Sequence, residues 1–168
     1  MNRATLPALG YVYAALALPA FIVSPEHFRL AAALYTGALF AYLWFVASLR
    51  AKLIRFDPDG FFASVVVLGS AALVPLQARE LVNPDAVIAA PAAACAATVI
   101  IGSSLAALRA RKIPRWFGQA GVAGGIAVLV LGLVEAGANW TFWRHDVFAS
   151  TIGFVIWVVV TATYLLRR

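Results

Sequence analysis

Six long apolar runs separated by short polar gaps make up most of the 168-residue chain. At 1.5 Å per residue, an α-helix of each run is long enough to cross a hydrocarbon core of roughly 30 Å. Helices are predicted because a segment in lipid must satisfy its own backbone hydrogen bonds, and no alternating pattern typical of a barrel is present. The sequence therefore predicts an all-α polytopic membrane protein, a single bundle over residues 1–168, with spans at 6–23, 28–48, 61–78, 86–108, 117–137 and 147–166.

Composition supports the same class. Hydrophobic residues make up 64% of the chain and charged residues 12%. In a soluble domain, about 45–50% of the residues are apolar and about 25% are charged. The net charge of +6 would suggest a nucleic-acid partner in a soluble protein, but the basic residues fall in the gaps between apolar runs. We therefore expect the lipid bilayer, and no nucleic acid, as a partner. The single cysteine, Cys95, excludes an intrachain disulfide and a Cys-based metal site.

The distribution of basic residues predicts the orientation. With the N-terminus in the cytoplasm, ten of the thirteen Lys and Arg residues fall on the inner side, and only Arg29, Arg79 and Arg144 fall outside. Such an asymmetry over short loops follows the positive-inside rule. The chain is expected to form three hairpins with short outer turns, basic inner linkers and both termini in the cytoplasm.

Two further interpretations stay open. Residues 2–20 have the features of a signal peptide, and its removal would leave five spans, although Pro19 stands where the cleavage motif would be. Leu-Arg pairs recur at 49–50, 108–109 and 166–167, which suggests a triplicated hairpin. Three unrelated hairpins that follow the positive-inside rule would produce the same pairs.

Small residues mark the expected helix-packing faces, because lipid gives helices no hydrophobic reason to associate. The fourth run is nearly all small, and the fifth carries glycines at heptad positions. These two runs are predicted to be the most closely packed pair. The packing residues are Ala90, Ala94 and Gly102 in the fourth run, and Gly118, Gly121, Gly125 and Gly132 in the fifth.

Glu135 and then Asn139 continue the glycine face of the fifth run. Glu135 is therefore expected to point towards protein, near the outer boundary, where an outer arginine such as Arg79 or Arg144 would pair with it. Gln77 is a second polar residue in an outer half. Three prolines, at 19, 75 and 91, also fall in outer halves and suggest an outer vestibule lined by Gln77 and Glu135.

Residues that could bind a metal gather in the outer turns. His27, His145 and Asp146 supply imidazole and carboxylate ligands of the kind that suit zinc or iron. No two histidines have a metal-binding spacing on a helix. Ser103 and Ser104 have no His or Asp at comparable depth, and nothing fixes a triad geometry for Ser24 and Thr141 near the outer histidines. No metal or other cofactor is therefore predicted, and the sequence leans against an enzyme.

The stretch KIPRWFGQAGVAGG, from Lys112 to Gly125, resembles a Leu-Pro-Arg-Trp-Leu-Gly element that precedes a Gly-rich helix. This element occurs in uncharacterised small multi-pass proteins of the bacterial inner membrane. Pro114 would start the helix, and Arg115 and Trp116 would anchor it at the inner interface. The resemblance covers about 14 residues and implies a bacterial inner-membrane location, but no activity and no site residue.

Three functions remain after these arguments. The first is a non-catalytic subunit or accessory protein of a larger membrane assembly, with a protein partner or a second copy in the membrane. The alternative is a small-solute transporter or channel that uses Gln77 and Glu135 in an outward vestibule. The third is a membrane enzyme or sensor that uses the outer histidines and carboxylates.

Overall fold

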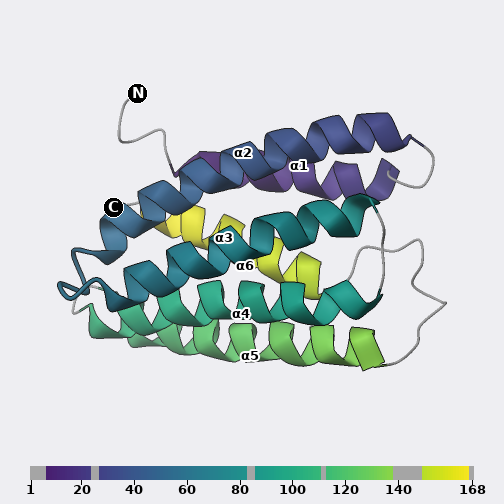
Figure 1. Cartoon of the computed structure of the whole chain (residues 1–168). Coiled ribbons are helices and arrows are strands. Elements are labelled where there is room, and N and C mark those ends of the chain that lie inside the picture. Colours follow the sequence, from purple (N-terminus) through teal and green to yellow (C-terminus); the bar gives the residue numbers. More distant parts are fainter. Residues whose placement is uncertain (1–6, 24–26, 83–85, 111–112, 138–148, 167–168) are drawn as a thin grey trace.

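The computed structural model describes residues 7–23, 27–82, 86–110, 113–137 and 149–166, and over these residues the chain is all-helical (Figure 1). In this part of the chain, six helices coincide with the six apolar runs. The helices are α1 (Leu9–Val23), α2 (Phe28–Leu53), α3 (Phe61–Val82), α4 (Ala86–Arg109), α5 (Arg115–Gly137) and α6 (Ala149–Leu166).

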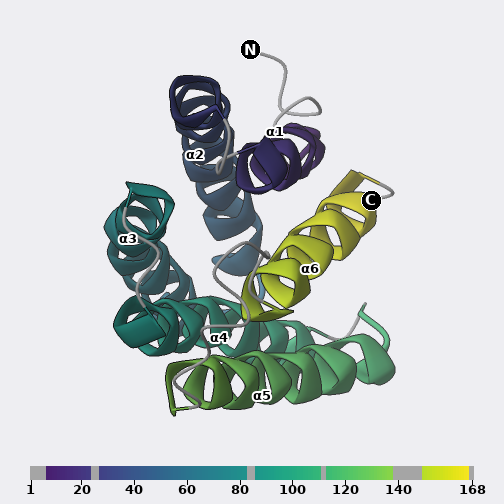
Figure 2. The same cartoon turned by 90° about the vertical axis from the view of Figure 1, so that its right-hand side faces the viewer.

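Viewed from one end of the bundle, α1, α2, α3, α4 and α6 form a ring around its centre, and α5 lies along the outer side of α4 (Figure 2). Each helix packs against the next one along the chain, and α6 packs against α1, which closes the ring. A hydrogen bond of 2.6 Å between the hydroxyls of Tyr11 and Thr163 joins α1 to α6. The α2–α3 and α4–α5 linkers lie at the same end of the bundle as the start of α1 and the end of α6 (Figure 1).

Four helices contain a segment that is long and apolar enough to cross a membrane: Arg29–Leu53, Phe61–Arg79, Ala90–Arg109 and Arg115–Gly137. The apolar segments of α1 and of the described part of α6, Leu9–Val23 and Ser150–Tyr164, are shorter. Several helix boundaries also differ from the predicted ones. Helix α1 begins at Leu9 rather than residue 6, α3 continues to Val82 rather than residue 78, and α4 ends at Arg109 rather than residue 108. Helix α2 continues to Leu53 rather than residue 48, and α5 begins at Arg115 rather than residue 117. In α2 the extra turn carries Arg50 and Lys52, where cations interact favourably with the helix dipole.

Three aromatic rings fill the centre of the ring of helices. Tyr13 of α1, Tyr42 of α2 and Phe154 of α6 are fully buried, and their ring centroids lie 5.2 to 6.3 Å apart. The Tyr42 hydroxyl also forms a 2.9 Å hydrogen bond with the hydroxyl of Ser70, which joins α2 to α3. The middle of the bundle is therefore packed with side chains.

The α4/α5 contact is the most extensive among the described helices. This is the pair that the small residues predicted, and it joins two predicted hairpins rather than the two helices of one. The α5 glycines face α4 closely: a Cβ added at Gly118 would lie 2.5 Å from Leu108, and one at Gly125 would lie 2.6 Å from Ile101. Gly102 faces Val65 of α3 instead, so the α4 stripe that contains it contributes to the α3/α4 interface.

Candidate functional site

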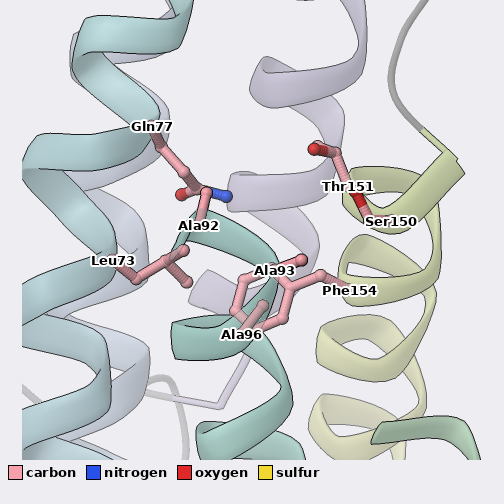
Figure 3. Close-up of a pocket in the computed structure, with 8 residues that line it drawn as sticks. All are labelled: Leu73, Gln77, Ala92, Ala93, Ala96, Ser150, Thr151 and Phe154. Atoms are coloured by element: carbon pink, nitrogen blue, oxygen red, sulfur yellow. The ribbon is translucent and has the colours of Figure 1, made fainter. Parts of the chain in front are cut away.

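A small polar cavity lies where α3, α4 and α6 meet. It has a volume of about 10 Å³ and is lined by Gln77 of α3, Ser150 and Thr151 of α6, and apolar residues that include Leu73 and Phe154. Gln77 extends from α3 towards the middle of the junction, and Thr151 projects from the opposite side (Figure 3). The cavity therefore brings together polar side chains that are more than 70 residues apart in the sequence.

Gln77 is only 2% exposed, and its Oε1 atom has no hydrogen-bond partner among the described residues. A buried acceptor without a partner costs about 1–3 kcal/mol. Gln77 lies on the same face of α3 as Leu73, which precedes it by four residues and lines the same cavity. Gln77 is thus buried between the helices, and its Oε1 atom lacks a hydrogen-bond partner among the described residues.

Glu135 of α5 is buried together with Gly118, Gly125, Val128 and Gly132, so it lies on the face that the glycine spacing predicted. Its partner is different from the expected one. Ser150 donates two hydrogen bonds to the carboxylate, from its hydroxyl to Oε2 (2.6 Å) and from its backbone N–H to Oε1 (3.3 Å).

The N-terminal end of α6 explains this pairing. The first backbone N–H groups of a helix have no partner within the helix and attract anions. Ser150 is the second residue of α6, and its N–H and hydroxyl both point to Glu135. Glu135 therefore acts as an acceptor for the first turn of α6 and joins α5 to α6. Among the described residues no ion pair links it to an arginine.

An apolar groove of about 310 Å³ lies on the other side of α6, between α5 and α6, with α4 as its floor. Small residues of α5, namely Ala120, Gly121, Gly124 and Ala127, form one wall, and the larger side chains of Ile156, Trp157 and Val160 form the other. Its volume is at the lower end of the range of small-molecule sites, roughly 300–1,000 Å³.

Two contacts between α5 and α6 bound this groove. At one end a Cβ on Gly153 would come within 2.9 Å of the Val128 side chain. At the other end the rings of Phe117 and Tyr164 stack with centroids 4.7 Å apart. Val128 follows Phe117 by eleven positions, which corresponds to about 16 Å along α5. Between the two contacts, a Cβ on Gly124 would have no neighbouring atom within 4 Å, so the groove is open there.

A third polar site, which the sequence analysis missed, lies at the opposite end of the bundle from Glu135. Asp57 of the α2–α3 linker is completely buried. Its Oδ2 accepts a 2.6 Å hydrogen bond from the backbone N–H of Phe62, and its Oδ1 lies 3.3 Å from Nη1 of Arg109. The Arg109 guanidinium also covers the Phe62 ring at 4.6 Å. Asp57 thus caps α3 and ties it to α4. The sequence signal was available, because Asp-Pro-Asp-Gly before an apolar run is typical of a turn that starts a helix.

Among the remaining candidates, the two that the structure describes do not join these sites. Arg79 is exposed in the last turn of α3, and His27 is exposed just before α2. Asn139, Arg144, His145 and Asp146 lie outside the described residues. Within the described ranges, no group of three or more His, Cys, Asp or Glu side chains is placed to hold a metal ion.

In place of the expected outer vestibule, the structure has a much smaller cavity. Pro19, Pro75 and Pro91 lie within α1, α3 and α4, as expected. The cavity that Gln77 lines, however, has only about 10 Å³, and Glu135 reaches it only through Ser150. Tyr42 and Phe154 fill the bundle centre next to it. In the described part of the chain, Gln77 and Glu135 therefore belong to one packed polar junction.

Comparison of the chain with models of protein families, with characterised proteins and with solved structures finds no match.

Proposed function

We propose that the protein is a non-catalytic subunit or accessory protein of a membrane assembly, and that the α5/α6 groove receives bulky apolar side chains from a transmembrane helix of its partner. The observation that carries the proposal is the groove itself, at Gly124. In a bundle whose centre is closely packed, it is a large apolar space with one wall made of small residues.

The wall of small residues on α5 favours a helix as the partner segment that binds in the groove. Ala120, Gly124 and Ala127 follow each other at spacings of four and three residues along α5, so they form one stripe. A stripe without large side chains allows a second helix to approach closely, which is how helices associate in lipid. Large side chains of that helix would then fill the space in front of Trp157 and Val160, as knobs fill holes.

We further propose that all six helices span the bacterial inner membrane, with both termini and the α2–α3 and α4–α5 linkers in the cytoplasm. The charge distribution supports this orientation, because Arg50, Lys52, Arg55, Arg109 and Arg115 all lie at or next to these two linkers. The test is labelling of Asp59→Cys, in a Cys95→Ala background, with a reagent that does not cross membranes. Inside-out vesicles should be labelled and intact cells should not; the reverse result would contradict the orientation.

The transporter alternative ranks second. The observation in its favour is the cluster of Gln77, Ser150 and Glu135, since polar groups at membrane depth are costly and are often functional. Conduction needs a polar or hydrated path through the whole bilayer. The rings of Tyr42 and Phe154 occupy the centre of the bundle beside the cluster, so a solute would require these rings to move.

The docking proposal is tested by photo-crosslinking in native membranes. A photoreactive amino acid at Ala127, which lines the groove, should give a discrete crosslinked protein band. The matched position is Ala123 on the same helix, which is exposed but does not line the groove, and it should give much less of this band. Mass spectrometry of the band identifies the partner. Adducts with lipid alone at Ala127 would contradict the proposal.

A further inference from the structure

We propose that the guanidinium group of Arg109 binds the headgroup phosphate of an anionic phospholipid, at the end of the bundle where the α2–α3 and α4–α5 linkers lie (Figure 1). The inference rests on the proposed orientation, in which this end lies at the cytoplasmic surface of the membrane. It does not depend on a partner helix in the α5/α6 groove, because Arg109 does not line that groove.

Two neighbours hold the Arg109 side chain in one orientation. Its Nη1 atom lies 3.3 Å from Oδ1 of Asp57, and the guanidinium lies over the Phe62 ring, 4.6 Å from the ring centroid. Asp57 and Phe62 are both buried, so the packed interior of the bundle fixes their positions. A guanidinium that is already oriented loses less conformational entropy when it binds a ligand.

The Arg109 guanidinium also has donors for a ligand. It carries five N–H groups, and among the described residues it donates a hydrogen bond to Asp57 alone. The Arg109 side chain is 58% exposed, so donors that Asp57 does not use can reach a ligand outside the bundle. The planar group matches the oxygens of a phosphate, to which arginine can donate two parallel hydrogen bonds.

The position of Arg109 along the bundle fits a lipid headgroup. A Cβ added at Gly118 of α5 would lie 2.5 Å from Leu108 of α4. Arg109, the next residue of α4, is therefore level with the first turn of α5. That turn carries Trp116, which is 66% exposed, and exposed tryptophans gather at the membrane interface. Arg109 and Trp116 are thus expected to lie together in the headgroup region.

The charge around Arg109 attracts an anion in spite of the negative charge of Asp57. Residues 50–60 and 109–115 together contain seven Lys and Arg residues and two Asp residues. Arg55 is exposed and precedes Asp57 by two residues, so their Cα atoms are at most about 7.6 Å apart. The backbone of a second arginine therefore lies close to the ion pair. Basic clusters between helices on the cytoplasmic side are suited to anionic headgroups.

The test is native mass spectrometry of the full-length protein in detergent, titrated with phosphatidylglycerol and, in parallel, with zwitterionic phosphatidylcholine. The wild type should bind its first phosphatidylglycerol roughly fivefold or more tightly than its first phosphatidylcholine. Inorganic phosphate at the same concentration should not displace the lipid, because the free ion lacks the acyl chains that contact the helices. Equal affinity for the two lipids, or displacement by inorganic phosphate, would overturn the proposal.

This result is separate from the tests of the proposed function, because lipid binding in detergent requires neither a membrane orientation nor a protein partner. Equal affinity for the two lipids, together with the expected labelling of Asp59→Cys, would refute the lipid site alone. The reverse labelling would refute the orientation and, with it, a site in the inner leaflet.

Two variants that conserve charge locate the site. Arg109→Lys loses the planar group that packs on Phe62 and donates paired hydrogen bonds. The first phosphatidylglycerol should therefore bind roughly fivefold more weakly, which is the effect of about one net hydrogen bond. The control is Arg50→Lys, since Arg50 is exposed in the last turn of α2 but lies seven residues before Asp57; it should bind the lipid as the wild type does. Equal affinities of the wild type and both variants would show that the whole basic surface attracts the lipid, and would contradict a site at Arg109.

Discussion

Asp57 and Arg109 form an ion pair between the start of α3 and the end of α4, with 3.3 Å between Oδ1 and Nη1. The two residues contribute unequally to the stability of the protein. The Arg109 side chain is 58% exposed, and ion pairs with such exposure contribute little to stability. Asp57 is fully buried and also caps α3 through the Phe62 N–H. The cap, rather than the charge pair, is the main contribution of this site.

Asp57→Ala should therefore lower the free energy of unfolding by about 1–2 kcal/mol, because it removes the cap of α3. Asp57→Asn keeps an oxygen acceptor for the Phe62 N–H and should cost less than half as much. Unfolding of the purified protein in detergent measures both values. The control is Asp59→Ala in the same linker, an exposed residue, which should have almost no effect. Equal losses for Asp57→Ala and Asp57→Asn would show that the charge pair dominates.

Ser150→Ala should destabilise the protein by about 1–3 kcal/mol, since it leaves the buried carboxylate of Glu135 without its hydroxyl donor. In the Glu135→Leu background the same substitution should cost much less, because no carboxylate remains to be satisfied. A double-mutant cycle measures this coupling. Ser103→Ala is the matched control, since the Ser103 hydroxyl donates only to carbonyls of its own helix. Additive effects of the Ser150 and Glu135 substitutions would contradict the interaction.

Gly125 and Gly124 are neighbours in α5 with opposite expected responses to alanine. A Cβ on Gly125 would lie 2.6 Å from the Ile101 side chain, and overpacking of this kind costs about 1–3 kcal/mol. A Cβ on Gly124 meets no atom within 4 Å, so Gly124→Ala should be neutral or stabilise the helix by up to about 1 kcal/mol. Thermal unfolding of the two single variants provides the comparison. A larger loss for Gly124→Ala than for Gly125→Ala would contradict the described α4/α5 packing.

Most of the helices could be predicted from the sequence, because apolar runs in lipid have few other ways to satisfy their backbone. The end of α2 was missed, since hydropathy falls at Arg50 and Lys52 while the helix continues to Leu53. The burial of Glu135 could be predicted too, because glycines at heptad spacing identify its face.

The partner of Glu135 could not be predicted. Ser150 is one hydroxyl in an apolar run, and its contact with Glu135 depends on how α5 and α6 meet in space. The groove at Gly124 could not be predicted for the same reason. Gly124 lies outside the heptad positions of the packed glycines, but whether the space in front of it is open or filled depends on the position of α6. Contacts between helices, unlike the helices themselves, depend on tilt and rotation that hydropathy does not encode.

The most direct test of the proposed function is to fill the groove and measure partner binding. Gly124→Leu places a large side chain in open space, so the protein should fold normally while the partner loses its place. Ala123→Leu adds a similar volume outside the groove. Quantitative co-purification from native membranes should show at least a tenfold loss of the partner, about 1.4 kcal/mol of binding free energy, for Gly124→Leu and little change for Ala123→Leu. Equal recovery of the same partner with both variants, at equal thermal stability, would contradict docking in the groove.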